Sequence, residues 1–169
     1  MGRDPEGVKK DLFGLQRLTR GALAEMRTLL VELRPQALIN ADLGDLIRQL
    51  ADGLAGRTEV EVILDIQGQH PLPAEVQTAF FRIAQESLNN VVKHARAGHV
   101  WIDYHNQVDD VSLCIRDNGC GFDMSNLPAE RLGLKILHER AASIGANMRI
   151  ESRPGCGTTV KVDWQGQQG

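Results

Sequence analysis

The sequence predicts a two-layer α/β sandwich, in which a mixed sheet is covered on one face by helices, preceded by a long helix of the bundle or coiled-coil type. Two observations predict this fold class. Beyond residue 60, strand-like and helix-like segments follow one another, and a sheet covered by helices buries the apolar side of both. Before residue 35, apolar residues recur every three or four positions, which is the spacing of a bundle seam.

The first 34 residues divide into a polar start and one long helix. Residues 1–10 are polar, and we expect them to be disordered. The helix is predicted over residues 11–34, because Pro35 ends it at or before Arg34. Its seam comprises Leu12, Leu15, Thr19, Ala22, Met26, Leu29 and Leu33, widened by Leu18, Leu23 and Leu30. So wide a stripe favours self-association in a bundle over packing on the helix's own domain.

Residues 35–164 are predicted to form one compact domain, and residues 165–169 a disordered tail. Strands are indicated by alternation of apolar and polar residues, helices by the 3.6-residue period, and hairpins by polar or glycine-rich turns. The expected elements are a helix at 42–54, a strand at 60–66, a helix at 74–96, a hairpin of strands 99–107 and 111–116, a helix at 134–145, and a hairpin of strands 148–151 and 158–164.

The composition narrows the function classes. The chain is 42% hydrophobic and 24% charged, as ordinary globular domains are. Its net charge of −3 provides no broad basic surface, which argues against nucleic acid or an anionic membrane as a partner. No apolar run reaches bilayer length, so we expect a cytoplasmic protein or the cytoplasmic portion of a larger one. Cys114, Cys120 and Cys156 lack the spacing of a disulfide framework or a zinc site.

The predicted helix at 74–96 has two distinct faces. One face carries apolar residues at helical spacing, which must contact the sheet: Phe80, Ala84, Leu88, Val91 and Ala95. The opposite face carries Glu86, Asn90 and Lys93, with Arg82 beside them and His94 at the margin. Taken singly, each could be a solvated residue, and Arg82 with Glu86 could form an ordinary i,i+4 pair.

A second set of polar residues follows the predicted strand at 111–116. Asp117 comes directly after the strand, and Gly119 and Gly121 allow a sharp turn and a close approach of the backbone to a ligand. A carboxylate ahead of such a turn is a hydrogen-bond acceptor facing a cleft. The final hairpin turns through a similar glycine-rich segment, residues 155–159, which also serves as an ordinary turn.

Four blocks in this order resemble the N, G1, G2 and G3 boxes of the GHKL ATPases, the superfamily of gyrase, heat-shock chaperone, histidine kinase and mismatch-repair protein. The blocks are Gln-Glu-Ser-Leu-Asn-Asn-Val-Val-Lys-His-Ala at 85–95, Asp-Asn-Gly-Cys-Gly-Phe at 117–122, Arg-Leu-Gly-Leu at 131–134 and Gly-Cys-Gly-Thr-Thr-Val at 155–160. The first block and Glu-Leu-Arg-Pro at 32–35 are most similar to the nitrate-sensor-type subfamily of two-component sensor histidine kinases. The resemblance covers residues 11–164 and implies the GHKL ATPase fold.

The resemblance implies Mg²⁺ and ATP as cofactors, and a role for each residue of the first block. Asn90 would offer its amide oxygen to Mg²⁺. Glu86 would act as the base or orient a water near the transferred phosphoryl group. Lys93, with His94 or Arg82 as weaker candidates, would stabilise phosphate charge.

The glycine-rich blocks would form the rest of the nucleotide pocket. By the same resemblance, Asp117 would accept a proton from the adenine amine, and Thr158 would reach the adenine pocket, with Thr159 as a weaker alternative. The backbone contacts implied lie at Gly119, Gly121, Gly133, Leu134 and Gly157. Residues 123–131 resemble a short ATP lid, and the helix that begins after them could hold phosphate at its N-terminus.

The resemblance therefore implies the catalytic region of a sensor histidine kinase, together with the second helix of its dimerisation and phosphotransfer bundle. Implied partners are the missing histidine-bearing bundle helix, a second copy of the full-length protein and the receiver domain of a response regulator. His138 precedes Glu139, as a phosphoacceptor histidine would, but it falls within the nucleotide domain and is expected to be an ordinary helical residue. Two alternatives stay open: a nucleotide-gated switch without kinase activity, and an interaction module that no longer binds nucleotide.

Overall fold

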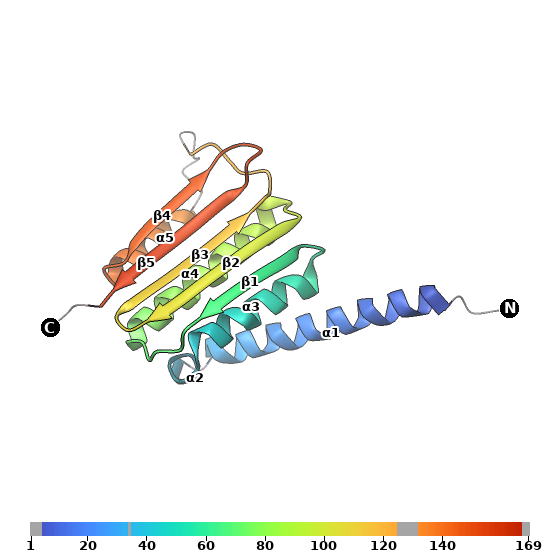
Figure 1. Cartoon of the computed structure of the whole chain (residues 1–169), viewed down its shortest axis with the longest axis horizontal. Coiled ribbons are helices and arrows are strands. Elements are labelled where there is room, and N and C mark those ends of the chain that lie inside the picture. Colours follow the sequence, from blue (N-terminus) through green and yellow to red (C-terminus); the bar gives the residue numbers. More distant parts are fainter. Residues whose placement is uncertain (1–4, 34, 125–131, 167–169) are drawn as a thin grey trace.

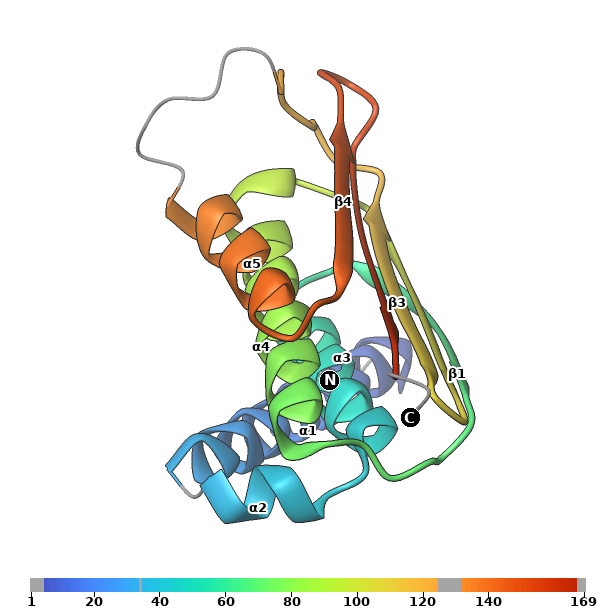
Figure 2. The same cartoon turned by 90° about the vertical axis from the view of Figure 1, so that its left-hand side faces the viewer.

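The computed structural model describes residues 5–33, 35–124 and 132–166, and within them it contains a five-stranded sheet of order β1-β2-β3-β5-β4. The elements are α1 (Pro5–Leu33), α2 (Pro35–Asn40), α3 (Leu43–Arg57), β1 (Glu61–Gln67), α4 (Ala74–Asn90), the π-helical turn η1 (Val91–Ala95), β2 (His99–Gln107), β3 (Asp110–Asp117), α5 (Leu132–Ser143), β4 (Asn147–Ser152) and β5 (Thr158–Gln165). Strand β1 pairs parallel with β2 and every other pair is antiparallel, so the sheet is mixed, as predicted. Helices cover one face of it (Figures 1 and 2), which confirms the fold class.

The hydrophobic core lies between the sheet and helices α3, α4 and α5. Buried residues alternate along β2, where Val100, Ile102 and Tyr104 face the helices. All the residues of the apolar face predicted for the long helix are buried: Phe80, Ala84, Leu88, Val91 and Ala95. The buried side chain of Gln77 donates to the carbonyl oxygens of Leu38 and Ala41, at 2.5 and 2.6 Å, and so fixes the connection between α2 and α3 to α4.

Helix α1 differs from its prediction at its start. It begins at Pro5, so residues 5–10, which we expected to be disordered, are helical. Proline suits the first turn of a helix, because its missing N–H has no partner there in any case. The end at Leu33 agrees with the prediction, and Pro35 begins the short helix α2, which the sequence did not indicate.

Helix α1 also packs on α3 of its own domain (Figure 1), through small residues. A Cβ on Gly21 would lie 2.6 Å from the Cα of Gly56, so the two backbones are in direct contact at the crossing. Of the predicted seam, the large apolar side chains that the structure describes lie outside this contact: Leu12, Leu15, Leu18, Leu23 and Met26 are each at least half exposed, from 50 to 61%.

Several element ends differ from the prediction: α3 runs to Arg57 rather than residue 54, and α5 covers Leu132–Ser143 rather than 134–145. The helix predicted to run to Arg96 ends at Asn90 and continues as η1, and Arg96 then adopts a left-handed conformation with φ of 51°. Gln165, assigned to a disordered tail, is the last residue of β5, because it pairs with Asp110 of β3 and extends the ladder to the sheet's end. Gly166, also assigned to the tail, donates its N–H to the carbonyl oxygen of Asp109 at 2.8 Å. Residues 167–169 lie outside the described residues.

Candidate nucleotide site

Asp117 is the last residue of β3 and is buried, with 6% of its surface exposed. Its Oδ1 accepts a hydrogen bond from the N–H of Gly119 at 2.8 Å. Burial raises the pKa of the Asp117 carboxyl above its ordinary value, and the backbone N–H groups of Gly119 and Thr158 act in the opposite direction. A buried carboxylate held by backbone donors at the end of a strand is suited to read a hydrogen-bond donor on a ligand.

The two glycine-rich loops pack directly on each other and on the end of the N box. A Cβ on Gly119 would lie 2.2 Å from the carbonyl oxygen of Ala95. Gly121, at φ of 56°, and Gly157, at φ of 76°, adopt left-handed conformations, and a Cβ on each would lie 2.0 Å from a carbonyl oxygen, that of Arg153 and that of Asp117 respectively. No side chain fits at these positions, so the glycines are required by the close approach of three chain segments.

Thr158, which was predicted to reach the adenine pocket, lies beside Asp117. It is the register partner of Asp117 in β3 and of Ser152 in β4, and its Oγ1 is 3.0 Å from the Oγ of Ser152. Ser152 also accepts a hydrogen bond from the N–H of Phe122 at 2.9 Å. Sequence reasoning missed Ser152; its only sequence signal is a polar residue at the end of the strand that precedes the turn.

Thr159 does not share this position. It is the register partner of Arg116 and Glu151, and neighbouring residues of a strand point to opposite faces of the sheet. Thr159 therefore lies on the face away from the helices, beside Arg116, whose guanidinium is 4.4 Å from the ring centre of Trp101. The register therefore gives the prediction for the Thr159 side chain no support.

The first turn of α5 reaches the polar face of α4. A Cβ on Gly133 would lie 2.8 Å from Oε1 of Glu86 and 3.9 Å from Nδ2 of Asn90. The G2 and N boxes, distant in sequence, are therefore in contact. Leu134 is partly buried against the hydrophobic core, so only its backbone remains a candidate for contact with phosphate.

Lys93 and His94 lie in η1 and are exposed. A π-helical turn has more residues per turn than an α-helix, so it rotates both side chains relative to the face that carries Glu86 and Asn90. The carbonyl oxygens of this turn contact the Asp117 loop: that of His94 lies 3.2 Å from Sγ of Cys120, and that of Ala95 accepts from the Cys120 N–H at 2.7 Å. η1 thus connects the end of α4, which carries Glu86 and Asn90, to the loop that follows Asp117.

The donor set fits a magnesium ion bound together with a triphosphate. Glu86 and Asn90, one helical turn apart on α4, offer carboxylate and amide oxygens. Among the described residues, no three His, Cys, Asp or Glu side chains gather in a way that would hold a metal. Mg²⁺ bound to a nucleotide needs no such cluster, because it takes most of its ligands from phosphate and water.

The structure describes only part of the predicted lid, and it describes His138 in full. Of the expected lid, residues 125–131 lie outside the described residues. His138 is exposed on α5, as expected for an ordinary helical histidine, and the preceding residue, Leu137, is fully buried in the core.

Among the described residues, no helix is both long enough and apolar enough to span a membrane.

Fold and site together define a nucleotide-binding α/β sandwich of the ATPase type. Residues 75–168, more than half of the chain, match the family described as histidine kinase-, DNA gyrase B-, and HSP90-like ATPase. The chain belongs to this family, whose domain binds ATP.

The curated relatives indicate which class of proteins within this family the chain is similar to. The chain is 36% identical over 148 residues to the sensor protein VraS of Staphylococcus haemolyticus and 34% identical over 148 residues to that of Staphylococcus aureus. These matches cover 88% of this chain and 42% of each relative, so the chain spans less than half the length of the sensor proteins it matches. The chain is thus homologous to the ATP-binding region of sensor histidine kinases.

Solved structures confirm the fold. The blue-light activated histidine kinase of Erythrobacter litoralis aligns with a TM-score of 0.65 at 18% identity, over 99% of this chain and 65% of that one. The ATP-binding domain of PrrB from Mycobacterium tuberculosis aligns with a TM-score of 0.58 at 24% identity, over 76% of this chain and 96% of that one.

Proposed function

We propose that the chain is the catalytic, ATP-binding part of a two-component sensor histidine kinase, which transfers the γ-phosphoryl group of ATP to a histidine for relay to the receiver domain of a response regulator. One observation carries the proposal: segments far apart in sequence converge at one end of the sandwich. Gly133 lies against Glu86, and Gly157 against Asp117. Asp117, the carboxylate proposed to read the base, and Glu86, the acid proposed to act near the phosphates, are thereby both held in place by packed backbone segments.

The proposed roles follow the chemistry of each position. Asp117 accepts the proton of the adenine amine, and Thr158 supports it from β5. Asn90 ligates Mg²⁺, which when bound neutralises phosphate charge. Glu86 takes the proton of the attacking group or orients a water, and Lys93 and His94 stabilise phosphate oxygens. The backbone N–H groups of the first turn of α5 add to this stabilisation. Thr159 is left out of the proposed site.

The acceptor histidine is proposed to lie on another helix. None of the five histidines belongs to α1, and each stands in the nucleotide domain. The exposed apolar seam of α1 is proposed to complete a homodimeric bundle with that helix. We place the protein in the cytoplasm, and within the nitrate-sensor-type subfamily on the wording of residues 85–95 and 32–35.

Nucleotide titration tests the proposal directly. The chain should bind a fluorescent ATP analogue more tightly with Mg²⁺ than without it. Asp117→Ala should lose about 1–3 kcal/mol of binding energy, or roughly 10–100-fold in affinity, because the purine amine is left without its acceptor. The matched control is Asp103→Ala, which removes an exposed carboxylate from β2 of the same sheet. Equal affinity of the unmodified chain for ATP and GTP would contradict the role of Asp117.

Phosphotransfer separates a kinase from a nucleotide-gated switch. A supplied helix that carries the acceptor histidine should become labelled from γ-labelled ATP, and the label should pass to a receiver domain. Binding of Mg-ATP without any transfer to such a helix would favour the switch.

A further inference from the structure

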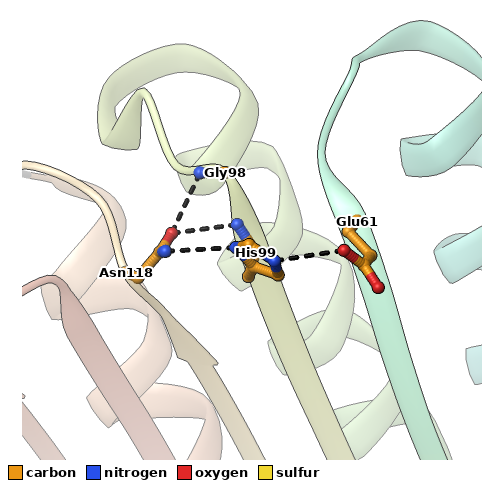
Figure 3. A network of polar contacts seen from close by, with 4 residues as sticks. All are labelled: Glu61, Gly98, His99 and Asn118. Atoms are coloured by element: carbon orange, nitrogen blue, oxygen red, sulfur yellow. Dashed lines mark hydrogen bonds and ion pairs between the residues drawn. The ribbon is translucent and has the colours of Figure 1, made fainter.

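Asn118, between Asp117 and Gly119, extends the β2–β3 ladder by one residue with its own side chain. The regular register ends at the pair of Val100 and Asp117. Beyond it, the N–H of Asn118 donates to the carbonyl oxygen of His99 at 3.3 Å. Its side-chain Oδ1 accepts from the N–H groups of both Gly98 and His99, each at 2.9 Å (Figure 3).

The other end of the same amide contacts the His99 ring. Nδ2 of Asn118 lies 3.3 Å from Nδ1 of His99, and Nε2 of His99 lies 3.1 Å from Oε2 of Glu61 in β1 (Figure 3). The ring also stacks on Trp101, with centroids 5.8 Å apart. The orientation of the amide is thereby determined: its oxygen faces two backbone donors and its nitrogen faces the imidazole.

The residues that follow Asn118 rest on the same stretch of chain. Gly119 lies against the carbonyl oxygen of Ala95, and the N–H of Cys120 donates to that oxygen at 2.7 Å. Residues 118–120 are therefore each held against residues 95–99. The segment that presents Asp117 is fixed from both sides, by the ladder before it and by these contacts after it.

We propose that Asn118 is a positioning residue that sets the place of the Asp117 carboxylate and thereby the selectivity of the site for adenine over other purines. It acts through the backbone of Gly98 and His99. The inference rests on the proposed function, since it assumes that Asp117 reads the base. Because the side-chain oxygen Oδ1 of Asn118 accepts both backbone hydrogen bonds, an acceptor at this position is required, whereas the donor to His99 is dispensable.

The test compares ATP with inosine triphosphate, which carries an oxygen where adenine carries its amine. Both nucleotides have the same ribose and phosphates, so the ratio of their dissociation constants reports on the base-reading contact alone. For the unmodified chain we expect a ratio on the order of 10–100 in favour of ATP. Asn118→Leu should lower the ratio by about threefold to tenfold. The N–H groups of Gly98 and His99 lose their acceptor in this variant, so the Asp117 carboxylate moves.

Two matched variants isolate the cause. Asn118→Asp keeps an oxygen acceptor and should retain the ratio, although it loses the contact with His99. Asn147→Leu changes an exposed asparagine at the first position of β4, in register with Asp163 rather than with the site, and should leave the ratio unchanged. Thermal unfolding of each variant checks the fold, and Asn118→Ala replaces the leucine variant if that one unfolds.

The outcomes separate this inference from the proposed function. An unchanged ratio in Asn118→Leu, with both nucleotides weakened in proportion, would show a merely structural role and overturn the inference alone. Loss of the ratio in Asn118→Asp as well would also overturn it, because the acceptor would not be what matters. No binding of ATP by the unmodified chain would refute the proposed function, and this inference with it.

Discussion

Two glycines of the nucleotide loops should respond to alanine in different ways. Gly155 has φ of 79° and no atom within 4 Å of where its Cβ would be, so the only cost of Gly155→Ala is conformational. A left-handed residue costs about 1–2 kcal/mol with a side chain, and the loss of freedom in the unfolded chain returns about 0.4–1 kcal/mol. The net loss of stability should be about 1 kcal/mol.

Gly119 presents the opposite case. Its φ is not in the left-handed region, but its Cβ would lie 2.2 Å from the Ala95 carbonyl oxygen, a backbone atom that cannot turn aside. The loop must move away and weaken the Cys120 to Ala95 hydrogen bond of 2.7 Å. Overpacking of this kind costs about 1–3 kcal/mol. Since the N–H of Gly119 also holds Oδ1 of Asp117, affinity for ATP should fall by about tenfold or more.

Urea unfolding and calorimetric titration with ATP measure both effects. The two variants should be destabilised to a similar extent, yet only Gly119→Ala should lose affinity, while Gly155→Ala stays within about threefold of the unmodified chain. Gly14→Ala is the control, because it lies in α1 with no atom within 4 Å of the added Cβ, and should stabilise that helix by about 0.5–1 kcal/mol. Equal losses of affinity in both loop variants, or a stable Gly119→Ala, would refute the reasoning.

Three further predictions concern single side chains. Asn90→Ala should weaken binding of Mg-ATP but not of metal-free ATP, measured by titration with and without EDTA; unchanged binding of Mg-ATP would place the metal elsewhere. Because burial raises the pKa of Asp117 in the folded state, its contribution to stability is complete below the ordinary Asp value and is lost as the pH rises through the raised value. Urea unfolding from pH 3 upward should show this fall in the unmodified chain and not in Asp117→Asn, and a parallel pH dependence of the two would contradict it. Incubation with γ-labelled ATP should leave His138 unlabelled, since Leu137 anchors this part of α5 in the core; acid-labile label on His138 would contradict the proposed acceptor on another helix.

The sequence predicted the sheet and the apolar faces well, because both depend on local periodicity. In β2, for example, the strand predicted at 99–107 has the buried residues Val100, Ile102 and Tyr104 at alternate positions. The glycine boxes could be located too, since no other residue tolerates the backbone at Gly121 and Gly157. What these signals have in common is that each is complete within a few residues of chain.

Features that depend on distant contacts were not predictable. The apolar period of α4 continues through Val91 and Ala95, so the local sequence does not predict the π-helical turn η1. The carbonyl oxygens of that turn contact the loop at 118–120. The contact of Gly133 with Glu86 depends on where α5 begins. The hydrogen bonds of Gln77 reach residues 36 to 39 positions away. Thr159 was assigned from a motif that does not state which of two adjacent threonines faces the helices.

For the long N-terminal helix α1, the sequence analysis weighed self-association in a bundle against packing on its own domain. The structure shows that the two are compatible. Its small residues Gly21 and Ala24 face α3, while the described leucines of the seam, from Leu12 to Leu23, are exposed. Contact between backbones at Gly21 and Gly56 leaves no flexible side chain to absorb a displacement. Helix α3 in turn packs on α4, which carries Glu86 and Asn90. A movement imposed on α1 through its exposed seam would therefore reach Glu86 and Asn90 through the packed helices α3 and α4, without passing through the glycine-rich loops.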